Sequence, residues 1–539
     1  MESLVGDGLS GLDPKTQSYL LLGLQVLFFI AAVRVLWLQF LTGRIRFAPK
    51  KKLKATLHYV GLLYTAVCFL FVSVLAYQAT WHLMGLLRPE FVTFMQRYDR
   101  RLFNPARQLN RGKILDRNQV VLAENKQTKE AVGRTYPLGP RAAHIVGYFH
   151  PVYGLSGLER TADGTLAGTR AESLEDWEQL GKNILTQEKS PAGKDLRLTL
   201  DARLQSAAYD LLGPRQGAVI VMGIRSGALY VVCSRPAIDP NRLNAKTFLG
   251  SGLEAPLLNR AIHGLYPPGS TFKIALAALA LERGMPDLIE CGSGFATSSG
   301  VKPIRDHVYY DRQRRGRRWG GYGKIGLSKA IADSSNVYFA KLGVQAGHQG
   351  FRWIAKQMAF NVPITLVGGA DGPMKAAASQ IPELRSGDQY GLAQMGIGQG
   401  KLVVTPLQMA LLTAAVANDG VAPSPRLLSE QSATAMGRFV SSATANKLGV
   451  MLRRVVTDGT ASKAKGLPWA LAGKTGTAEN SRGLSHSWFV GYVPFELPQF
   501  VVCVMVENGG YGSTAALPVA MGLVREAGRL GLIQALVGN

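Results

Sequence analysis

Residues 217–234 have the sequence GAVIVMGIRSGALYVVCS, in which two runs rich in valine and small residues stand on either side of Arg225-Ser226-Gly227. Two such runs around a short turn that contains glycine are typical of a β-hairpin. Three more strand-like segments lie near the end of the chain: WALAGKTGTAEN (469–480), SWFVGYVP (487–494) and QFVVCVMVEN (499–508). The two groups of strands together predict an antiparallel sheet.

Helical patterns occupy the sequence between these two groups of strands. They lie around residues 270–283, 328–344, 405–418 and 440–456, and one more follows the last strand near 515–532. Helices placed in sequence between groups of antiparallel strands indicate an α+β domain. We therefore expect residues 196–539 to form one domain, with a central antiparallel sheet flanked by helices.

The composition is that of a basic protein with ordinary hydrophobic content. The 539 residues include 61 Lys and Arg against 36 Asp and Glu, which gives a net charge of +25. Such a charge attracts polyanions. No zinc-finger spacing, basic zipper or RNP-type strand accompanies it, so we expect no nucleic-acid partner. Membrane lipid and anionic cell-wall polymer are the better candidates.

Metal and disulfide chemistry have no support in the sequence. The four cysteines, Cys68, Cys233, Cys291 and Cys503, are far apart and form no CxxC pair. The eight histidines form no HExxH motif or His/Cys cluster. We therefore expect no catalytic metal and no other cofactor.

Two apolar segments precede the globular part of the chain. Residues 16–43 contain a single charge, Arg34, and residues 57–87 contain none. Each segment is long enough to cross a bilayer, and we expect transmembrane helices at about 17–42 and 57–82. An interfacial or re-entrant helix is the alternative for the first segment, because Arg34 lies well inside it.

The charges between the two apolar segments predict their orientation. The connecting sequence GRIRFAPKKKLK (43–54) contains six basic residues and no acid. Short basic loops stay on the cytoplasmic side of a membrane. Residues 1–87 therefore predict a hairpin in the cytoplasmic (inner) membrane, with the chain from Arg88 onward on the extracytoplasmic or periplasmic side.

The region 88–195 mixes charges and turn residues with short apolar pieces. KILDRNQVVLAE (113–124) and AHIVGYF (143–149) predict strands. The polar stretch 165–195 ends in SPAGKD. We expect an elongated β-rich module with a domain boundary near Asp195.

The first candidate for chemistry is Ser270 with Lys273, in YPPGSTFKIALAALAL (266–281). Proline and glycine precede an apolar helix, so the two side chains lie one turn apart on the same face. A serine hydroxyl is a weak nucleophile unless a base takes its proton, and a neutral lysine amine can do so. The pKa of that lysine must then fall from about 10.4 towards 7. A single S-x-x-K pair is a weak signal, because such pairs also arise by chance.

Ser334 and Asn336 form the second candidate element, on either side of Ser335 in DSSNVYFAKLG (333–343). A hydroxyl and an amide two residues apart at the start of a helix can relay a proton and bind a substrate carbonyl. The alternative is a simple helix cap, since serine and asparagine are favoured at helix N-termini.

The third element is AGKTGTAEN (472–480), in which Lys474, Thr475, Gly476 and Thr477 occupy a strand-like segment. Glycine allows a substrate backbone to approach a strand closely, and Lys474 supplies positive charge for a carboxylate. A strand glycine beside a solvated lysine is the alternative for this segment taken alone.

The three elements occur in the order S-x-x-K, S-x-N, K-T-G, which is the signature of penicillin-binding proteins and serine β-lactamases. Four more stretches make the chain similar to class B penicillin-binding proteins over roughly residues 105–510. They are NRGKILDRN (110–118), AAHIVGYFHPVYGLSGLE (142–159), LTLDARLQ (198–205) and GIGQGKLVVTPLQMA (396–410). The chain departs from the family at Gln119, where glycine is usual, and in its predicted membrane hairpin, where a single anchor is typical.

The resemblance implies a peptidoglycan D,D-transpeptidase that cross-links stem peptides through an acyl-enzyme and is inhibited covalently by β-lactam antibiotics. It implies that Ser270 is the acylated nucleophile and Lys273 its base. Ser334 would pass the proton to the leaving D-alanine nitrogen, and Asn336 would hold the substrate amide.

The resemblance also assigns roles to the third element. Lys474 and Thr475 would bind the terminal carboxylate region beside Gly476. The backbone N–H groups of Ser270 and Thr477 would form the oxyanion hole, where each donor is worth about 3 kcal/mol.

Two other activities remain open at this point. A D,D-carboxypeptidase uses the same acyl-enzyme with water as acceptor. A largely non-catalytic scaffold would instead activate a membrane glycosyltransferase. A β-lactamase would be about half this length and secreted, and a bifunctional synthase would need a glycosyltransferase domain for which residues 88–195 leave no room.

The predicted domains include no glycosyltransferase, which bears on the partner that we expect. The resemblance implies a separate membrane polymerase of the SEDS type as partner, and it leaves open whether the protein serves elongation, division or sporulation. The arginine-rich loop DRQRRGRRWGGYGK (311–324) is either a solvated loop or a contact with anionic polymer, lipid or protein.

Overall fold

The computed structural model describes only part of the chain. The described residues are 34, most of 61–78, 111–127, 132–150, 152–168, 193–249, 254–369, 372–480 and 483–533. The chain divides into two units, Met1–Val92 and Thr93–Asn539, and each is described by itself.

In the first unit, the described residues between 61 and 78 are helical, and Leu70 and Phe71 are 65% and 64% exposed. Apart from Arg34, the predicted span 17–42 lies outside the described residues, as does part of the span 57–82. Over the part of the chain that the structure describes, no helix combines the length and the apolar character needed to cross a bilayer.

The second unit is built on a five-stranded sheet in the order β15-β16-β17-β7-β8, and every neighbouring pair is antiparallel. The strands are β7 (Gly217–Gly223), β8 (Leu229–Arg235), β15 (Ala472–Ala478), β16 (His486–Val493) and β17 (Phe500–Val506). The predicted hairpin is confirmed as β7–β8. The two groups of strands meet where β17 pairs with β7, with Cys503 opposite Ile220.

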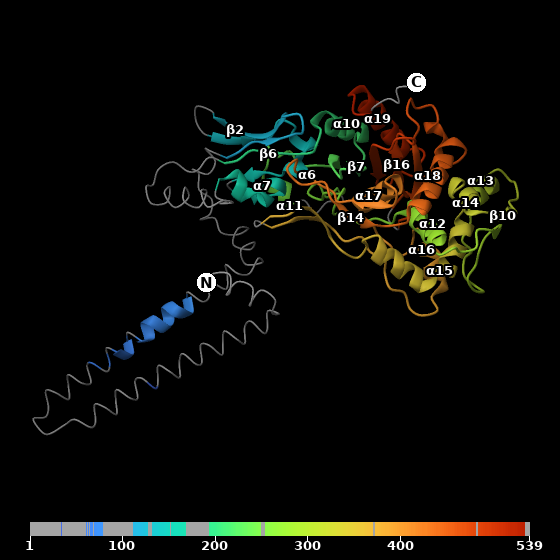
Figure 1. Cartoon of the computed structure of the whole chain (residues 1–539), viewed down its shortest axis with the longest axis horizontal. Coiled ribbons are helices and arrows are strands. Elements are labelled where there is room, and N and C mark those ends of the chain that lie inside the picture. Colours follow the sequence, from blue (N-terminus) through green and yellow to red (C-terminus); the bar gives the residue numbers. More distant parts are fainter. Residues whose placement is uncertain are drawn as a thin grey trace, which may run out of the picture. The chain divides into compact units, whose positions relative to one another are not determined.

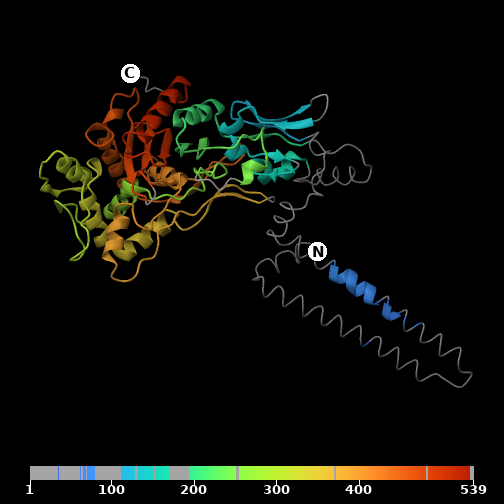
Figure 2. The same cartoon turned by 180° about the vertical axis from the view of Figure 1, so that it is seen from behind.

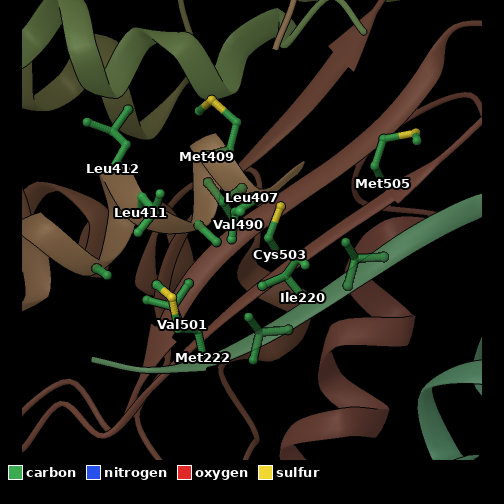
Figure 3. Close-up of a cluster of buried hydrophobic side chains, with 14 of the residues drawn as sticks. Ile220, Met222, Leu407, Met409, Leu411, Leu412, Val490, Val501, Cys503 and Met505 are labelled. Carbon is green, nitrogen blue, oxygen red and sulfur yellow. The ribbon is translucent and has the colours of Figure 1, made fainter. Parts of the chain in front are cut away.

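Every residue of β7 and β17 is buried, so both faces of the sheet are covered. Helices α10 (Ala202–Leu212) and α19 (Ala516–Arg529) pack together and against strands of the sheet, and α17 (Pro406–Ala417) packs against β7, β16 and β17. Figure 3 shows the contact of α17 in detail, with leucines of the helix beside Val490, Cys503 and Ile220. Each such buried side chain contributes about 1.5–3 kcal/mol to the stability of the fold, relative to the same side chain left exposed.

The remaining predicted helices are also present. They are α12 (Lys273–Glu282), α14 (Leu327–Ala332), α15 (Asn336–Gln357) and α18 (Ser442–Thr457). The single run predicted at 328–344 is two helices, because the chain breaks at Ser334, which has φ 58°. The hydroxyl of Ser335 then caps α15 by accepting a hydrogen bond from the backbone N–H of Tyr338 at 3.2 Å.

Helices α13 (His307–Arg314) and α16 (Gln389–Gly396) are among those that the sequence did not predict. No residue of α13 is buried, so its sequence lacks the apolar periodicity by which a helix is recognised. Helices α13, α14 and α15 lie at one end of this unit and β2 at the other, as both the front and back views show (Figures 1 and 2).

The described residues of 111–197 form a smaller module with its own sheet. Its strands β1 (Ile114–Leu115), β2 (Val121–Gln127), β3 (Val132–Thr135) and β6 (Leu196–Arg197) lie in the order β3-β2-β1-β6. The strands predicted in KILDRNQVVLAE are confirmed as β1 and β2. The module also contains a buried group of ion pairs. The carboxylate of Glu159 accepts hydrogen bonds from the guanidinium groups of Arg111 and Arg134, each at 2.7 Å.

The strand predicted at AHIVGYF is mostly wrong. Residues Ala143–Val146 form helix α6, and only Phe149–His150 form a strand, β4. Local hydrogen bonds from Val146 to Ala142 and from Gly147 to Ala143 favour the helix, and Gly147 ends it with φ 80°, a conformation that suits glycine. The module is therefore mixed in secondary structure.

Gln119, the departure from the family pattern, lies in the turn between β1 and β2 with φ 66°. A side chain in this left-handed region costs about 1–2 kcal/mol, which explains why glycine is usual here. The neighbouring Asp116 offsets the cost, because its Oδ1 accepts hydrogen bonds from the backbone N–H groups of Asn118 and Val120 at 2.6 and 2.8 Å.

The remaining described elements are η2 (Gly139–Arg141), β5 (Gly154–Leu155), α7 (Gly157–Thr161), α8 (Asp163–Leu166), α11 (Ala245–Leu249), β9 (Ile289–Gly292), β10 (Gly321–Ile325), β11 (Ile364–Val367), β12 (Met374–Ala376), β13 (Val421–Pro423), β14 (Ala435–Arg438) and η4 (Ser462–Ala464).

Candidate active site

A cleft of about 840 Å³ opens beside β15, the strand at the edge of the five-stranded sheet. Its walls come from segments that are far apart in the sequence. They include Ser270, Arg305, Ser334, Asn336, Gln399, Thr460, Thr475, Thr477, Glu479 and Tyr511. The cleft therefore brings all three candidate sequence elements to one place.

Ser270 stands in the short helix η3 (Gly269–Phe272), directly before α12. Lys273 is the first residue of α12, and its side chain is fully buried. The sequence predicted both residues in one helix; the structure instead puts the serine in a 3-10 turn that leads into the helix. Ser270 thus lines the cleft while Lys273 points into the protein interior.

Lys273 joins the first element to the second. Its Nζ donates to the backbone oxygen of Ser334 at 2.8 Å and to Oδ1 of Asn336 at 2.8 Å, and it lies 3.3 Å from Oγ of Ser334. The break between α14 and α15 makes this possible, because the left-handed conformation of Ser334 turns both its carbonyl and its hydroxyl towards the lysine. The strain at Ser334 costs on the order of 1 kcal/mol and is located where it shapes the site.

Burial lowers the pKa of Lys273 from 10.5 to about 7, and the carboxylate of Asp306 opposes this shift in part. An ammonium group without a carboxylate in direct contact loses its hydration on burial, which favours the neutral amine. The neutral amine, which can accept a proton, is therefore accessible near neutral pH.

Asp306, which sequence reasoning missed, fixes the start of α15. Its Oδ1 accepts hydrogen bonds from Oγ of Ser335 at 3.1 Å, from the backbone N–H of Val337 at 3.2 Å and from the backbone N–H of Asn336. Asp306 is fully buried. A carboxylate at a helix N-terminus satisfies the free N–H groups and interacts favourably with the helix dipole.

The side chain of Asn336 is held at both ends. Its Oδ1 accepts from Lys273, and its Nδ2 donates to the backbone oxygen of Arg305 at 2.9 Å. The amide is therefore oriented before any substrate enters. The helix-cap alternative applies to the middle residue of the motif, since Ser335 caps α15 while Ser334 and Asn336 line the cleft.

The third element lies on β15, at the edge of the sheet. Lys474 is fully buried, and its Nζ donates to the backbone oxygen of Thr475 at 3.1 Å. Burial lowers the pKa of Lys474 well below its ordinary value, and the charge of Lys273 adds to this shift. The hydroxyl of Thr475 lies 2.6 Å from that of Thr460, a second residue that sequence reasoning missed.

Gly476 is required by the packing of the protein itself. A Cβ at this position would lie 2.9 Å from Cγ2 of Thr271, 3.0 Å from Cβ of Trp488 and 3.1 Å from the backbone oxygen of Pro268. The backbone of Gly476 is therefore approached closely by the segment that contains Ser270. Since that segment and β15 are in contact, the position of the serine is fixed against the strand.

The predicted site residues separate into two groups. Ser270, Ser334, Asn336, Thr475 and Thr477 line the cleft. Lys273 and Lys474 are fully buried, so they act on the cleft through hydrogen bonds and charge. Asp306 and Thr460 carried no signal in the sequence, because each is a single polar residue outside any motif.

Comparison with known families covers most of the second unit. The family model described as "Penicillin binding protein transpeptidase domain" matches residues 217–525. A second model, "Penicillin binding protein A dimerisation domain", matches residues 111–194.

Individual relatives agree with these matches. The peptidoglycan D,D-transpeptidase PbpA of Mycolicibacterium smegmatis is 30% identical over 441 residues, which are 74% of this chain and 84% of the relative. The peptidoglycan D,D-transpeptidase MrdA of Acinetobacter baumannii is 29% identical over 449 residues, 71% of this chain and 64% of the relative.

Solved structures show the same similarity. Penicillin-binding protein A from M. tuberculosis, as its imipenem acyl-enzyme complex, superposes with a TM-score of 0.68 at 26% identity and covers 78% of this chain and 99% of that one. Its penicillin G acyl-enzyme complex gives a TM-score of 0.67 with the same identity and coverage. Given this fold, this cleft and these relatives, the chain belongs to the class B penicillin-binding proteins and is a serine-type peptidoglycan D,D-transpeptidase.

Proposed function

We propose that Ser270 is the residue acylated in the transpeptidase reaction and that Lys273 is its base. Oγ of Ser270 attacks the carbonyl carbon between the two D-alanines of a donor stem peptide, an ester forms, and the peptide C–N bond breaks. The terminal D-alanine leaves with a proton on its nitrogen. An amine of a second stem peptide then attacks the ester, which restores the serine and completes the cross-link. The buried, hydrogen-bonded Lys273 is the observation that supports this proposal best.

The other motif residues have roles that fit their positions. Ser334, with its Oγ 3.3 Å from Nζ of Lys273, passes the proton to the departing nitrogen. Asn336, held at both ends, binds the amide on the acyl side of the donor. The backbone N–H groups of Ser270 and Thr477 stabilise the oxyanion, since donors placed in advance lower the barrier without reorganisation.

The terminal carboxylate of the donor binds beside β15. The hydroxyls of Thr475 and Thr477 line the cleft there, next to Gly476, and Thr460 orients the hydroxyl of Thr475. Lys474 contributes its charge from behind the strand, and a bound carboxylate would favour its protonated form. These roles make Thr475 and Thr477 contacts of the substrate and Lys474 a source of positive potential.

Replacing Ser270 by alanine is expected to abolish covalent labelling by a fluorescent penicillin, because the ester oxygen is lost. Peptide mass spectrometry of the wild-type protein should find the adduct on the peptide that contains Ser270. The matched control is Ser335→Ala, which removes a cap hydroxyl and leaves the nucleophile in place. An adduct on any other residue would refute the assignment.

Acylation is expected to depend on pH in the way that a lysine base of lowered pKa requires. The amine is active when neutral, so the rate should rise as pH increases through about 7 and then level off. Lys273→Arg should slow acylation by about 10²–10⁴-fold, because a guanidinium is not deprotonated. The measurement is the second-order rate constant of penicillin acylation between pH 5 and 10. A rate still rising steeply at the upper limit would show that Lys273 titrates near its ordinary value.

We also propose the domain order 1–87, 88–195 and 196–539, with the first segment as a membrane hairpin in the cytoplasmic membrane and the catalytic domain outside. The six basic residues of 43–54 and the exposed apolar side chains of the helix within 61–78 support this topology.

The topology can be measured with single cysteines at Ala48 and at the exposed Val152, in a chain from which the four native cysteines are removed. In intact spheroplasts, an impermeant thiol reagent should label Val152→Cys and leave Ala48→Cys unlabelled until the membrane is permeabilised. The reverse pattern would overturn the proposed orientation.

A further proposal is that the hairpin binds a membrane polymerase of the SEDS type, since the resemblance to class B penicillin-binding proteins implies such a partner and a charge inside a span favours a polar partner. Arg34→Leu should then reduce recovery of the polymerase several-fold on purification in mild detergent. Lys52→Leu, which removes a basic residue from the connecting loop, is the control. Equal recovery with both variants would mean that Arg34 has no part in the contact.

A further inference from the structure

The wall of the cleft next to Asn336 is rich in basic side chains. The segment 302–307 and helix α13 supply Lys302, Arg305 and Arg314 to the cleft lining. Arg314 forms an ion pair with Asp311. Among the described residues, neither Lys302 nor Arg305 has an ion-pair partner, and Glu479 is the one carboxylate of the lining. The wall therefore offers two cations to whatever occupies the cleft.

Arg305 is held in place, unlike an ordinary surface arginine. Its guanidinium carbon lies 3.9 Å above the centre of the Tyr309 ring, and the residue is half-buried. Stacking uses the flat face of a guanidinium and leaves the N–H groups at its edge free, and those groups match a carboxylate in geometry. An arginine fixed in this way loses little conformational entropy when it binds an anion.

The position of Arg305 also indicates which part of a substrate it would meet. Its backbone oxygen accepts the hydrogen bond from Nδ2 of Asn336, so the two residues are neighbours on the same wall. In the proposed function, Asn336 binds the acyl side of the donor, and the terminal carboxylate lies across the cleft beside Thr475 and Thr477. Arg305 thus lies next to the donor residues that precede D-Ala-D-Ala.

We propose that Arg305 and Lys302 form a subsite for a second carboxylate of the donor peptide, carried by the side chain of the residue before D-Ala-D-Ala. The inference rests on the proposed function, because the orientation of the donor comes from it. A hydrogen-bonded ion pair of this kind is expected to select an acidic donor over its amide by about tenfold or more.

The arginines of the loop that follows α13 are not part of the proposed subsite. Arg317 is exposed and does not line the cleft. It lies in the arginine-rich loop 311–324, outside the cleft lining, and therefore provides a control of equal charge change.

Two synthetic donors that differ only in the side chain before D-Ala-D-Ala, carboxylate in one and carboxamide in the other, test the subsite with the full-length protein. The quantity measured is kcat/KM for release of D-alanine. Wild type should prefer the carboxylate donor by about tenfold. Arg305→Gln should reduce this preference to near one, Lys302→Gln should reduce it in part, and Arg305→Lys should restore some of it. Arg317→Gln should keep the wild-type preference.

Three results would overturn the proposal. One is a wild-type protein that does not distinguish the two donors. The second is an Arg305→Gln variant that slows both donors equally, which would mean that Arg305 acts only by supporting Asn336. The third is a loss of preference in Arg317→Gln, which would locate the anion site on the exposed segment. Penicillin acylation of Ser270, measured in parallel, separates these results from a failure of the proposed function, because that failure would leave no adduct on Ser270.

Discussion

The candidate active site depends on an amine buried without a carboxylate in contact. Lys273 is bound to the carbonyl of Ser334 and to the side chain of Asn336, and its neighbours supply oxygens but no direct counter-charge. The neutral amine suits such a pocket, whereas the ammonium is penalised by the loss of water. The break between α14 and α15, the cap on α15 and the carboxylate of Asp306 all serve to hold those oxygens in place.

The chain order of the strands explains how three short motifs from distant segments meet. The first two strands of the sheet, β7 and β8, precede all three motifs, and the last three strands contain or follow the third. Pairing of β17 with β7 joins the ends of the domain and leaves β15 at the edge. The segment with Ser270 packs against that edge through Gly476, and the pair of helices α14 and α15 packs on the other side of α12. The geometry of the candidate site is thus a result of how the sheet closes the domain.

The sequence predicted the large features of this fold, because valine-rich strands and apolar helices give strong local signals. The five strands, the hairpin and most helices of the domain were of this kind. Five residues of the three motifs, Ser270, Ser334, Asn336, Thr475 and Thr477, line the cleft. Other features depend on contacts that no local pattern encodes. AHIVGYF contains the apolar residues of a strand, yet local hydrogen bonds and Gly147 make most of it a helix. Asp306 and Thr460 matter only because the fold brings them to Asn336 and Thr475. The membrane hairpin stays a prediction, since most of it lies outside the described residues.

The buried amine has a consequence for stability that follows from its pKa. In the unfolded chain a lysine binds its proton below about pH 10.4, whereas Lys273 in the folded protein does so only below about 7. The free energy of unfolding therefore decreases as pH falls through this range. Below pH 7 the burial of Lys273 lowers it by its full amount, on the order of 5 kcal/mol. Lys474 adds to this cost in the same direction. The apolar burial of α12 offsets it, since the seven residues Ile274–Ala280 are all buried. A domain of this size tolerates two buried lysines because its large core stabilises the fold. The same core excludes the water that would return Lys273 to its ordinary pKa.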